Sequence, residues 1–167
     1  MGVEQDIFKS VKQALEDNAT LQKYVNKVYD GLRSFDDAFV PQGIKNYIVL
    51  EPLSCEEVYP VGGETLDSVH EVPKQLRMTI GIVGVITAVA NTDQSFVLTN
   101  IGAENMPGIL ELDEDIKNAL DSSSTVQALS DAQVLNVSTM SFIFETFPKR
   151  KVSINLTIYR NIGKGDR

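Results

Sequence analysis

Cys55, the single cysteine, and His70, the single histidine, are the side chains best suited to nucleophilic chemistry. A cysteine nucleophile needs a base within hydrogen-bond reach, yet His70 lies in a stretch with two Pro and two Gly that predicts a loop. The single cysteine also excludes an internal disulfide, and the single histidine excludes most histidine-rich metal sites. We therefore predict no catalytic site, and we interpret Cys55 as a small, semi-buried residue that follows a strand.

Four acidic residues form the densest group of potential metal ligands: Glu111, Asp113, Glu114 and Asp115. Carboxylate oxygens are the ligands that Ca²⁺ and Mg²⁺ prefer. On a helix, however, these four side chains would spread over nearly the whole circumference and could not converge on one ion. Acidic residues are favoured in the first turns of a helix by its dipole. The group predicts a solvated acidic helix face, with neither a metal nor a cofactor.

The basic residues are concentrated near one end of the chain. Residues 148–167 hold six Lys and Arg against one Asp, whereas residues 1–147 have a net charge of −13 within a total of −8. So acidic a chain is a poor candidate for wrapping nucleic acid, and the run Lys149, Arg150, Lys151 has no interleaved aromatic residues for stacking on bases. The uneven charge favours head-to-tail attraction between copies or docking on an acidic neighbour; a solvated basic turn and tail is the alternative.

Hydrophobic periodicity predicts the elements that position these residues. Amphipathic patterns predict a helix over residues 3–17, with Lys12 and Glu16 paired one turn apart, and a second helix that starts at Pro107 and ends before the run 121–124. Asn18 ends the first helix, and Thr20 can cap a short turn that follows it. Alternating patterns predict strands over residues 46–51 (halted by Pro52), 76–89, 134–147 and 152–158, with a hairpin turn at 148–151.

This order of elements predicts an α+β fold, a mostly antiparallel β-sheet with two main helices packed on one face. With 167 residues, 43% of them hydrophobic, the chain forms one domain over 1–167. We expect an excursion loop at about 60–73 and a flexible basic C-terminus at about 161–167. Residues 61–73 should be either mobile in the free subunit or ordered only against a neighbour. The strand at 76–89 should begin half exposed and end covered on both faces. The core should include the following residues: Ile82, Ile86, Ile116, Leu120, Val152, Ile154, Leu156 and Ile158.

The sequence predicts neither a membrane span nor a secretory signal peptide. No apolar run approaches the roughly 20 residues of a membrane span. The first residues, MGVEQDIFKS, lack the basic-then-apolar order of a signal peptide. We expect a protein made in a reducing compartment and without a membrane partner.

The chain resembles the tail terminator (tail completion) proteins of tailed bacteriophages. The likeness spans about residues 5–161 and rests on the order and hydrophobic pattern of the following segments: LQKYVNKVYDGL, NYIVLEP, the long strand after the excursion, GILELDEDIKNAL and VSTMSFIFETFPKRKVSINLTIYRN. The excursion at 60–73 and the stretch 91–105 have no place in that pattern. Related neck proteins and some baseplate or sheath-linked proteins have similar small α+β folds.

The resemblance implies a structural virion protein, not an enzyme, that forms a hexameric ring on the last ring of the tail tube. Such a ring ends tail growth at the head-proximal end and presents the head-tail joining surface. The implied partners are further copies of the chain, the tail tube protein, the head connector or neck protein and, in a contractile tail, the sheath protein. Genome DNA would pass through the lumen without sequence-specific binding, and assembly would take place in the host cytoplasm.

Within this interpretation, six residues are candidate subunit or tail contacts: Lys149, Arg150, Lys151, Glu111, Glu114 and Asp115. Three alternatives stay open. The first is another neck, connector or baseplate-sheath-linked structural protein. The second is a small ligand-binding or enzymatic α+β domain, which would need a pocket with convergent polar groups. The third is a monomeric adaptor or assembly chaperone.

Overall fold

The computed structural model describes residues 2–31, 46–58, 74–87, 108–129, 138–146 and 149–162. Three predicted features lie outside these ranges: the excursion at 60–73, which includes His70, the stretch 91–105, and residues 163–167. Residues 161 and 162, which the prediction assigned to a flexible C-terminus, belong to the last strand.

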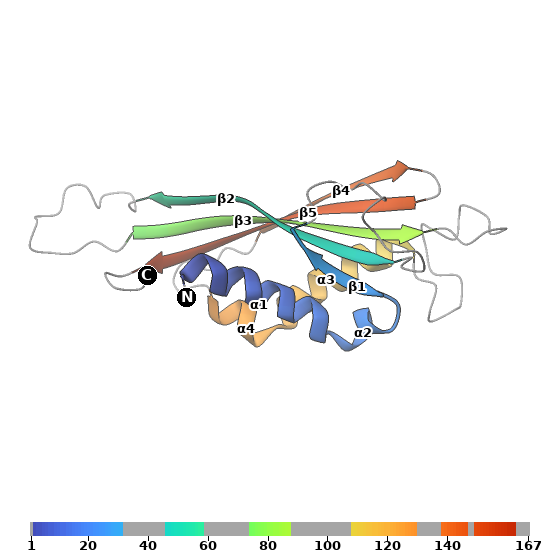
Figure 1. The fold of residues 1–167 in the computed structure, drawn as a ribbon, viewed down its shortest axis with the longest axis horizontal. Helices are drawn as coiled ribbons and strands as arrows, with labels where there is room; N and C mark the ends of the chain where they lie inside the picture. The colour runs from blue at the N-terminus through green and yellow to red at the C-terminus, as the bar shows by residue number, and fades with distance from the viewer. Residues whose placement is uncertain are drawn as a thin grey trace, which may run out of the picture.

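Five strands form one mixed sheet in the order β1-β2-β3-β5-β4 (Figure 1). Their bounds are β1 Lys27–Asp30, β2 Tyr47–Val58, β3 Lys74–Thr87, β4 Ser138–Thr146 and β5 Lys149–Ile162. Only the β1–β2 pair is parallel; the pairs β2–β3, β3–β5 and β4–β5 are antiparallel. The helices all lie on one side of this long, twisted sheet, as Figure 1 shows. The predicted α+β class with helices on one face is confirmed.

Two long and two short helices make up the second layer: α1 Val3–Asp17, α2 Ala19–Gln22, α3 Ile109–Ser122 and α4 Ser124–Leu129. The predicted bounds of α1 are confirmed, as is the Lys12–Glu16 ion pair at 3.7 Å. Asn18, not Thr20, caps α2: its Oδ1 accepts hydrogen bonds from the backbone N–H of Thr20 and Leu21. The cap ahead of α3 is Gly108, so this helix begins two residues later than the predicted start at Pro107.

The main core lies between the helices and the face of the sheet that they cover, which we call the inner face. All eight residues predicted for the core are buried, with exposed fractions of 0–4%. They join the apolar stripe of α1, which includes Ile7, Val11 and Leu15. The alternation of β5 therefore places Val152, Ile154, Leu156 and Ile158 inward, as predicted, and leaves the intervening polar residues partly exposed.

The central strand β3 changes from half covered to fully covered along its length. Arg77 is exposed and Thr79 partly exposed, whereas every residue from Gly81 to Ile86 is buried. At Gly84 the helix α3 approaches so closely that an added Cβ would lie 2.6 Å from Leu112 Cδ2. The predicted burial of this strand on both faces at its end is confirmed, and the lack of a side chain at Gly84 makes room for α3.

Strand β2 does not stop at Pro52, contrary to the prediction. It continues to Val58, with a register shift between Pro52 and Ser54 that leaves Leu53 as the extra residue of a bulge. The β1–β2 ladder ends at Leu50, whose carbonyl accepts a hydrogen bond from Gly31 N–H at 2.9 Å. Because backbone groups alternate sides along a strand, the nitrogen of Pro52 faces the side where β1 has already ended. A proline is tolerated there because no ladder hydrogen bond is lost.

Candidate functional site

The basic run does not occupy a hairpin turn. Lys149, Arg150 and Lys151 are the first residues of β5 and pair with β3 and β4, so the connection between β4 and β5 is limited to residues 147 and 148. Lys151 lies opposite Val85 in the sheet and is only 6% exposed. The predicted turn at 148–151 is wrong for Lys149, Arg150 and Lys151, which lie in β5. The structure does not describe the side chains of Lys149 and Arg150.

Two of the four residues in the predicted acidic group, Glu111 and Asp113, serve the helix α3 itself. The Glu111 carboxylate accepts a hydrogen bond from Gly108 N–H at 3.0 Å and so caps the start of the helix. Asp113 is 9% exposed and forms an ion pair with Lys117 at 3.0 Å, one turn along the helix. The predicted solvated face is therefore narrower than the sequence suggested.

Asp115 is also engaged within the subunit. The hydroxyl of Tyr24 donates a hydrogen bond of 2.6 Å to Asp115 Oδ2, which ties the segment after α2 to α3. Burial raises the pKa of the Tyr24 hydroxyl strongly, and the hydrogen bond to Asp115 and its negative charge raise it further. Glu114 is exposed. Of the three acidic residues predicted as contacts, only Glu114 has no internal bond in the described structure.

Cys55 lies inside β2, not after it, and is exposed. The pKa of its thiol is raised, first by partial desolvation and second by the carboxylate of Glu4. A raised pKa keeps the thiol protonated near neutral pH, and the protonated form is a weak nucleophile. His70 lies outside the described residues, so the proposed Cys55–His70 pairing is not tested by the structure.

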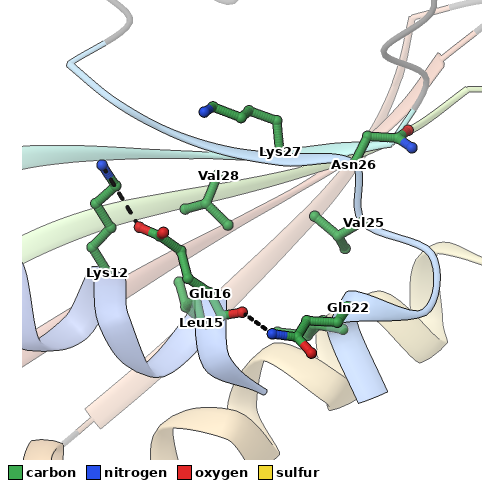
Figure 2. Close-up of a pocket in the computed structure, with 9 residues that line it drawn as sticks. Lys12, Leu15, Glu16, Gln22, Val25, Asn26, Lys27 and Val28 are labelled. Atoms are coloured by element: carbon green, nitrogen blue, oxygen red, sulfur yellow. Dashed lines mark hydrogen bonds and ion pairs between the residues drawn. The ribbon is translucent and has the colours of Figure 1, made fainter. Parts of the chain in front are cut away.

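The open groove in Figure 2 has a volume of about 240 Å³ and lies where the end of α1 meets the segment between α2 and β1. Its floor includes Leu15 and Val28, both buried. Three of its polar residues are bonded within the chain: Lys12 forms ion pairs with Glu16 at 3.7 Å and with Asp30 at 3.2 Å. The amide of Gln22 donates to the carbonyl oxygen of Glu16 at 2.8 Å. These bonds fasten α1 to its neighbours and engage Lys12, Glu16 and Gln22 within the chain.

A second open cavity, of about 500 Å³, lies between the start of α2 and the polar side of α3. Six residues, all of polar or acidic type, line it: Asn18, Thr20, Asp115, Asn118, Asp121 and Ser122. Two of these groups are already bonded, because Asn18 caps α2 and Asp115 accepts from Tyr24. Small-molecule sites combine an apolar lining with a few polar groups. No residue with an apolar side chain lines this cavity.

Within the described ranges, no group of three or more His, Cys, Asp or Glu residues is placed to hold a metal ion. Among those same residues, no helix has the length and apolar character needed to cross a membrane. A comparison of the chain with protein-family models and with curated proteins finds no match. The functional argument therefore depends on the fold and on the surfaces of the chain itself.

One surface that the sequence reasoning missed is the second half of β2. Residues 52–56 are all exposed, and Leu53, at 54%, is the most exposed large hydrophobic residue among those described. We call residues 51–56 the β2 edge. The available signal was the segment LEPLSCEE, whose Glu residues and exposed Leu follow the expected end of the strand. Because Pro52 was interpreted as the end of the strand, this exposed surface was not predicted.

Proposed function

We propose that this protein is a structural subunit of a bacteriophage tail, which closes the tail tube as a ring and forms the surface that joins the tail to the head. The observation that carries the proposal is the architecture: an N-terminal amphipathic helix, a mixed sheet of long strands and a later helix on the same face. That is the element order on which the resemblance to tail terminator proteins rests. In this chain the segments that carry the resemblance include the helices α1 and α3 and the strands β2 to β5.

The side chains of the described residues support a structural role over a catalytic one. Several polar groups that line the two cavities are bonded within the chain, and the raised pKa of the Cys55 thiol disfavours the nucleophilic thiolate. The net charge of −8 also suits a conduit for DNA, because a negative lumen repels phosphates and lets the duplex slide. Six copies is what the resemblance implies for the ring.

The test is electron microscopy of virions assembled without this protein. We expect tails of abnormal length that carry no heads, and restoration of normal virions when the protein is supplied in trans. Tails of normal length that lack heads would replace the terminator by the neck-protein alternative. Normal, infectious virions would overturn both structural assignments.

Position and stoichiometry provide a second measurement in the same experiment. Labelled protein should appear at the head-proximal end of the tail, and averaged images should show six copies around the axis. A label at the baseplate, or a different number of copies, would contradict the proposed place or the proposed ring.

A further inference from the structure

Two exposed lysines border the groove of Figure 2. Lys23 and Lys27 flank residues 25 and 26, which form one wall of the groove, and Lys27 itself lines it. Among the described residues, neither lysine has an acidic partner. The two acids beside the groove, Glu16 and Asp30, both contact Lys12 instead. The rim of the groove therefore has two cations available to a neighbouring molecule.

The inside of this groove is apolar. Four residues with apolar side chains line it: Leu15, Leu21, Val25 and Val28. Val25 is only partly buried, and Figure 2 shows that Val28 points from β1 toward the helices, whereas Lys27 points away from them. The charged lining residues are Lys12, Lys27 and Glu16, a net charge of +1 in a chain of net charge −8. The groove therefore suits an apolar side chain that has carboxylates beside it.

The β2 edge presents such a side chain. Among the described residues, two large hydrophobic side chains are exposed, Leu53 at 54% and Leu110 at 43%. Two acids on the same strand accompany Leu53: Glu51 is partly exposed and Glu56 is exposed. The acid next to Leu110 is Glu111, which is engaged in capping α3. Leu53 is therefore the better match to a groove with a basic rim.

A bulge and a glycine keep Leu53 outward. The bulge makes Leu53 an extra residue in β2, and its side chain lies over Gly81 of β3, where an added Cβ would be 3.2 Å from Leu53 Cδ1. Bulges commonly redirect a side chain at a sheet edge. The redirected side chain gains little burial here, so the local geometry presents a leucine to a neighbour and does not add it to the core.

The carboxylates beside Leu53 are accessible. Strand β1 pairs with β2 only as far as Leu50, and beyond it no described strand lies on that side. Glu56 contacts Arg77 at 3.7 Å, but the two side chains are 57% and 45% exposed. So exposed a pair contributes little to stability, and Glu56 can exchange Arg77 for another cation at small cost.

One chain cannot place its own Leu53 in its own groove. Lys27 pairs with Tyr47 of β2, and Leu53 lies six residues further along that strand, about 20 Å away at the usual rise of a strand. Leu53 also lies over Gly81 on the outer face, whereas the groove is bounded by α1, on the inner side of the sheet. The two surfaces can therefore meet only between different copies.

We propose that the β2 edge of one copy of this chain binds the groove of a second copy, with Leu53 in the groove and Glu51 and Glu56 beside Lys23 and Lys27. The inference rests on the proposed ring, and it names the two surfaces that join its subunits. Because the two surfaces differ, the contact is heterologous, the kind that closes into rings. Leu53 supplies the apolar anchor, and the charges steer the approach.

Backbone pairing is not the means of attachment at the β2 edge. Pro52 offers no N–H to a new strand, and the bulge interrupts the regular spacing of backbone groups. Both features hinder an incoming strand from extending the sheet there. A neighbour is therefore held by side chains, which suits a discrete ring and disfavours open-ended sheet growth.

A charge-exchange experiment tests the pairing directly. Variant A carries Glu51→Lys and Glu56→Lys, and variant B carries Lys23→Glu and Lys27→Glu. Each variant alone brings like charges together at every contact, so we expect self-association at low salt to weaken at least about tenfold relative to wild type. In an equimolar mixture every A–B contact is again complementary. The mixture should therefore assemble, and only into complexes with equal numbers of A and B, which native mass spectrometry resolves.

The matched control for variant A changes the net charge by the same amount elsewhere. Glu114→Lys with Asp121→Lys reverses two exposed acids of α3, and this variant should associate like wild type. Loss of association in the control but not in variant A would overturn the inference and favour α3 as the docking surface. Wild-type association by A or B, or no recovery in the mixture, would also overturn it. Wild-type protein that stays monomeric would do the same, whereas the proposed function is judged independently by tail length.

Two leucine variants test the apolar anchor without any change of charge. Leu53→Ala should weaken self-association about tenfold at low salt, while its thermal unfolding stays close to that of wild type. Leu110→Ala truncates the other exposed leucine and should associate like wild type. Wild-type association by Leu53→Ala, or an equal loss in the two variants, would contradict the assignment of Leu53 to the groove.

A zero-length cross-link identifies the contact in the wild-type protein. A carbodiimide joins a carboxylate to a lysine amine only where the two touch, and an equimolar mixture of ¹⁴N- and ¹⁵N-labelled protein marks the links that form between copies. We expect links from Glu51 or Glu56 to Lys23 or Lys27, and their loss at high salt. Intermolecular links confined to other pairs, or none at all, would overturn the proposed contact.

Discussion

The two faces of the sheet are covered in different ways. Helices α1, α3 and α4 cover the inner face, where residues from β2, β3 and β5 are almost completely buried. On the outer face, Tyr47, Val49, Val83 and Val85 form a second buried cluster at one end. The other end of that face is polar and partly exposed, and includes Thr79 and Thr157, whose hydroxyls lie 3.1 Å apart.

This difference in burial indicates that the two faces of the sheet have different roles. Burial on the inner face provides the hydrophobic free energy that holds the domain together. The polar end of the outer face and the adjoining β2 edge add little to that core and keep their side chains accessible. Mutations on the two sides should therefore have different effects on stability, and the following pairs are chosen to expose that difference.

The largest contrast is expected between two leucines. Leu156→Ala removes a fully buried side chain from the inner face, and should lower the free energy of unfolding by about 2–5 kcal/mol. Leu53→Ala truncates a side chain that is 54% exposed, and should change it by about 0.5 kcal/mol or less. Urea unfolding in high salt, where association is suppressed, measures both. Equal losses would show that the edge belongs to the core.

A smaller contrast is expected between two glycines of β3. Gly84→Ala places a Cβ 2.6 Å from Leu112 Cδ2 on the inner face, and such overpacking should cost about 1–3 kcal/mol. Gly81→Ala meets Leu53 at 3.2 Å, but that side chain is exposed and can move away. The outer substitution should therefore be nearly neutral, or slightly stabilising because alanine is better ordered than glycine in a strand. Thermal unfolding of the two variants decides; a costlier Gly81→Ala would reverse the assignment of the faces.

The predictable parts of this fold are those with long hydrophobic periods. Helix α1 and strands β3 and β5 carry such periods over 14 or 15 residues, and their core residues follow directly. Strand β1 and helix α4 have four and six residues, too few for a period to be recognised, and neither was predicted. The Ser123 hydroxyl, which accepts from Val126 N–H at 3.2 Å, is the local signal that α4 offered.

The surfaces were harder to predict because they depend on distant parts of the chain. Whether Pro52 ends a strand depends on where β1 stops, since a proline is acceptable only on an uncovered edge. Lys151 looks like a turn cation in sequence, but pairing with β3 and β4 on both sides makes its position central in the sheet. The bond between Tyr24 and Asp115 joins residues 91 positions apart, and no local pattern reveals it. The acids available for docking could therefore not be identified before the fold was known.

The smallest effect concerns that bond, which makes Asp115 part of the helical layer and not a docking group. Tyr24→Phe removes the hydroxyl that donates to Asp115 at 2.6 Å, and should cost about 1–2 kcal/mol near neutral pH. Self-association should be unchanged, because Asp115 lies outside the proposed contact. Weaker association without loss of stability would indicate that Asp115 takes part in contacts between subunits.

The same bond has a characteristic pH dependence. Burial, and then the bond to Asp115, raise the pKa of Tyr24 in the folded state above its unfolded value of about 10. Below that value both states keep the proton, and the full contribution to stability is present. Above it the unfolded state releases a proton that the folded state retains, so this contribution falls by up to about 1.4 kcal/mol per pH unit. The stability gap between wild type and Tyr24→Phe, followed by urea unfolding from neutral pH to about pH 11, should therefore shrink only above about pH 10. A gap that stays constant to pH 11 would mean that the hydroxyl is solvated and that Asp115 is free to contact a neighbour.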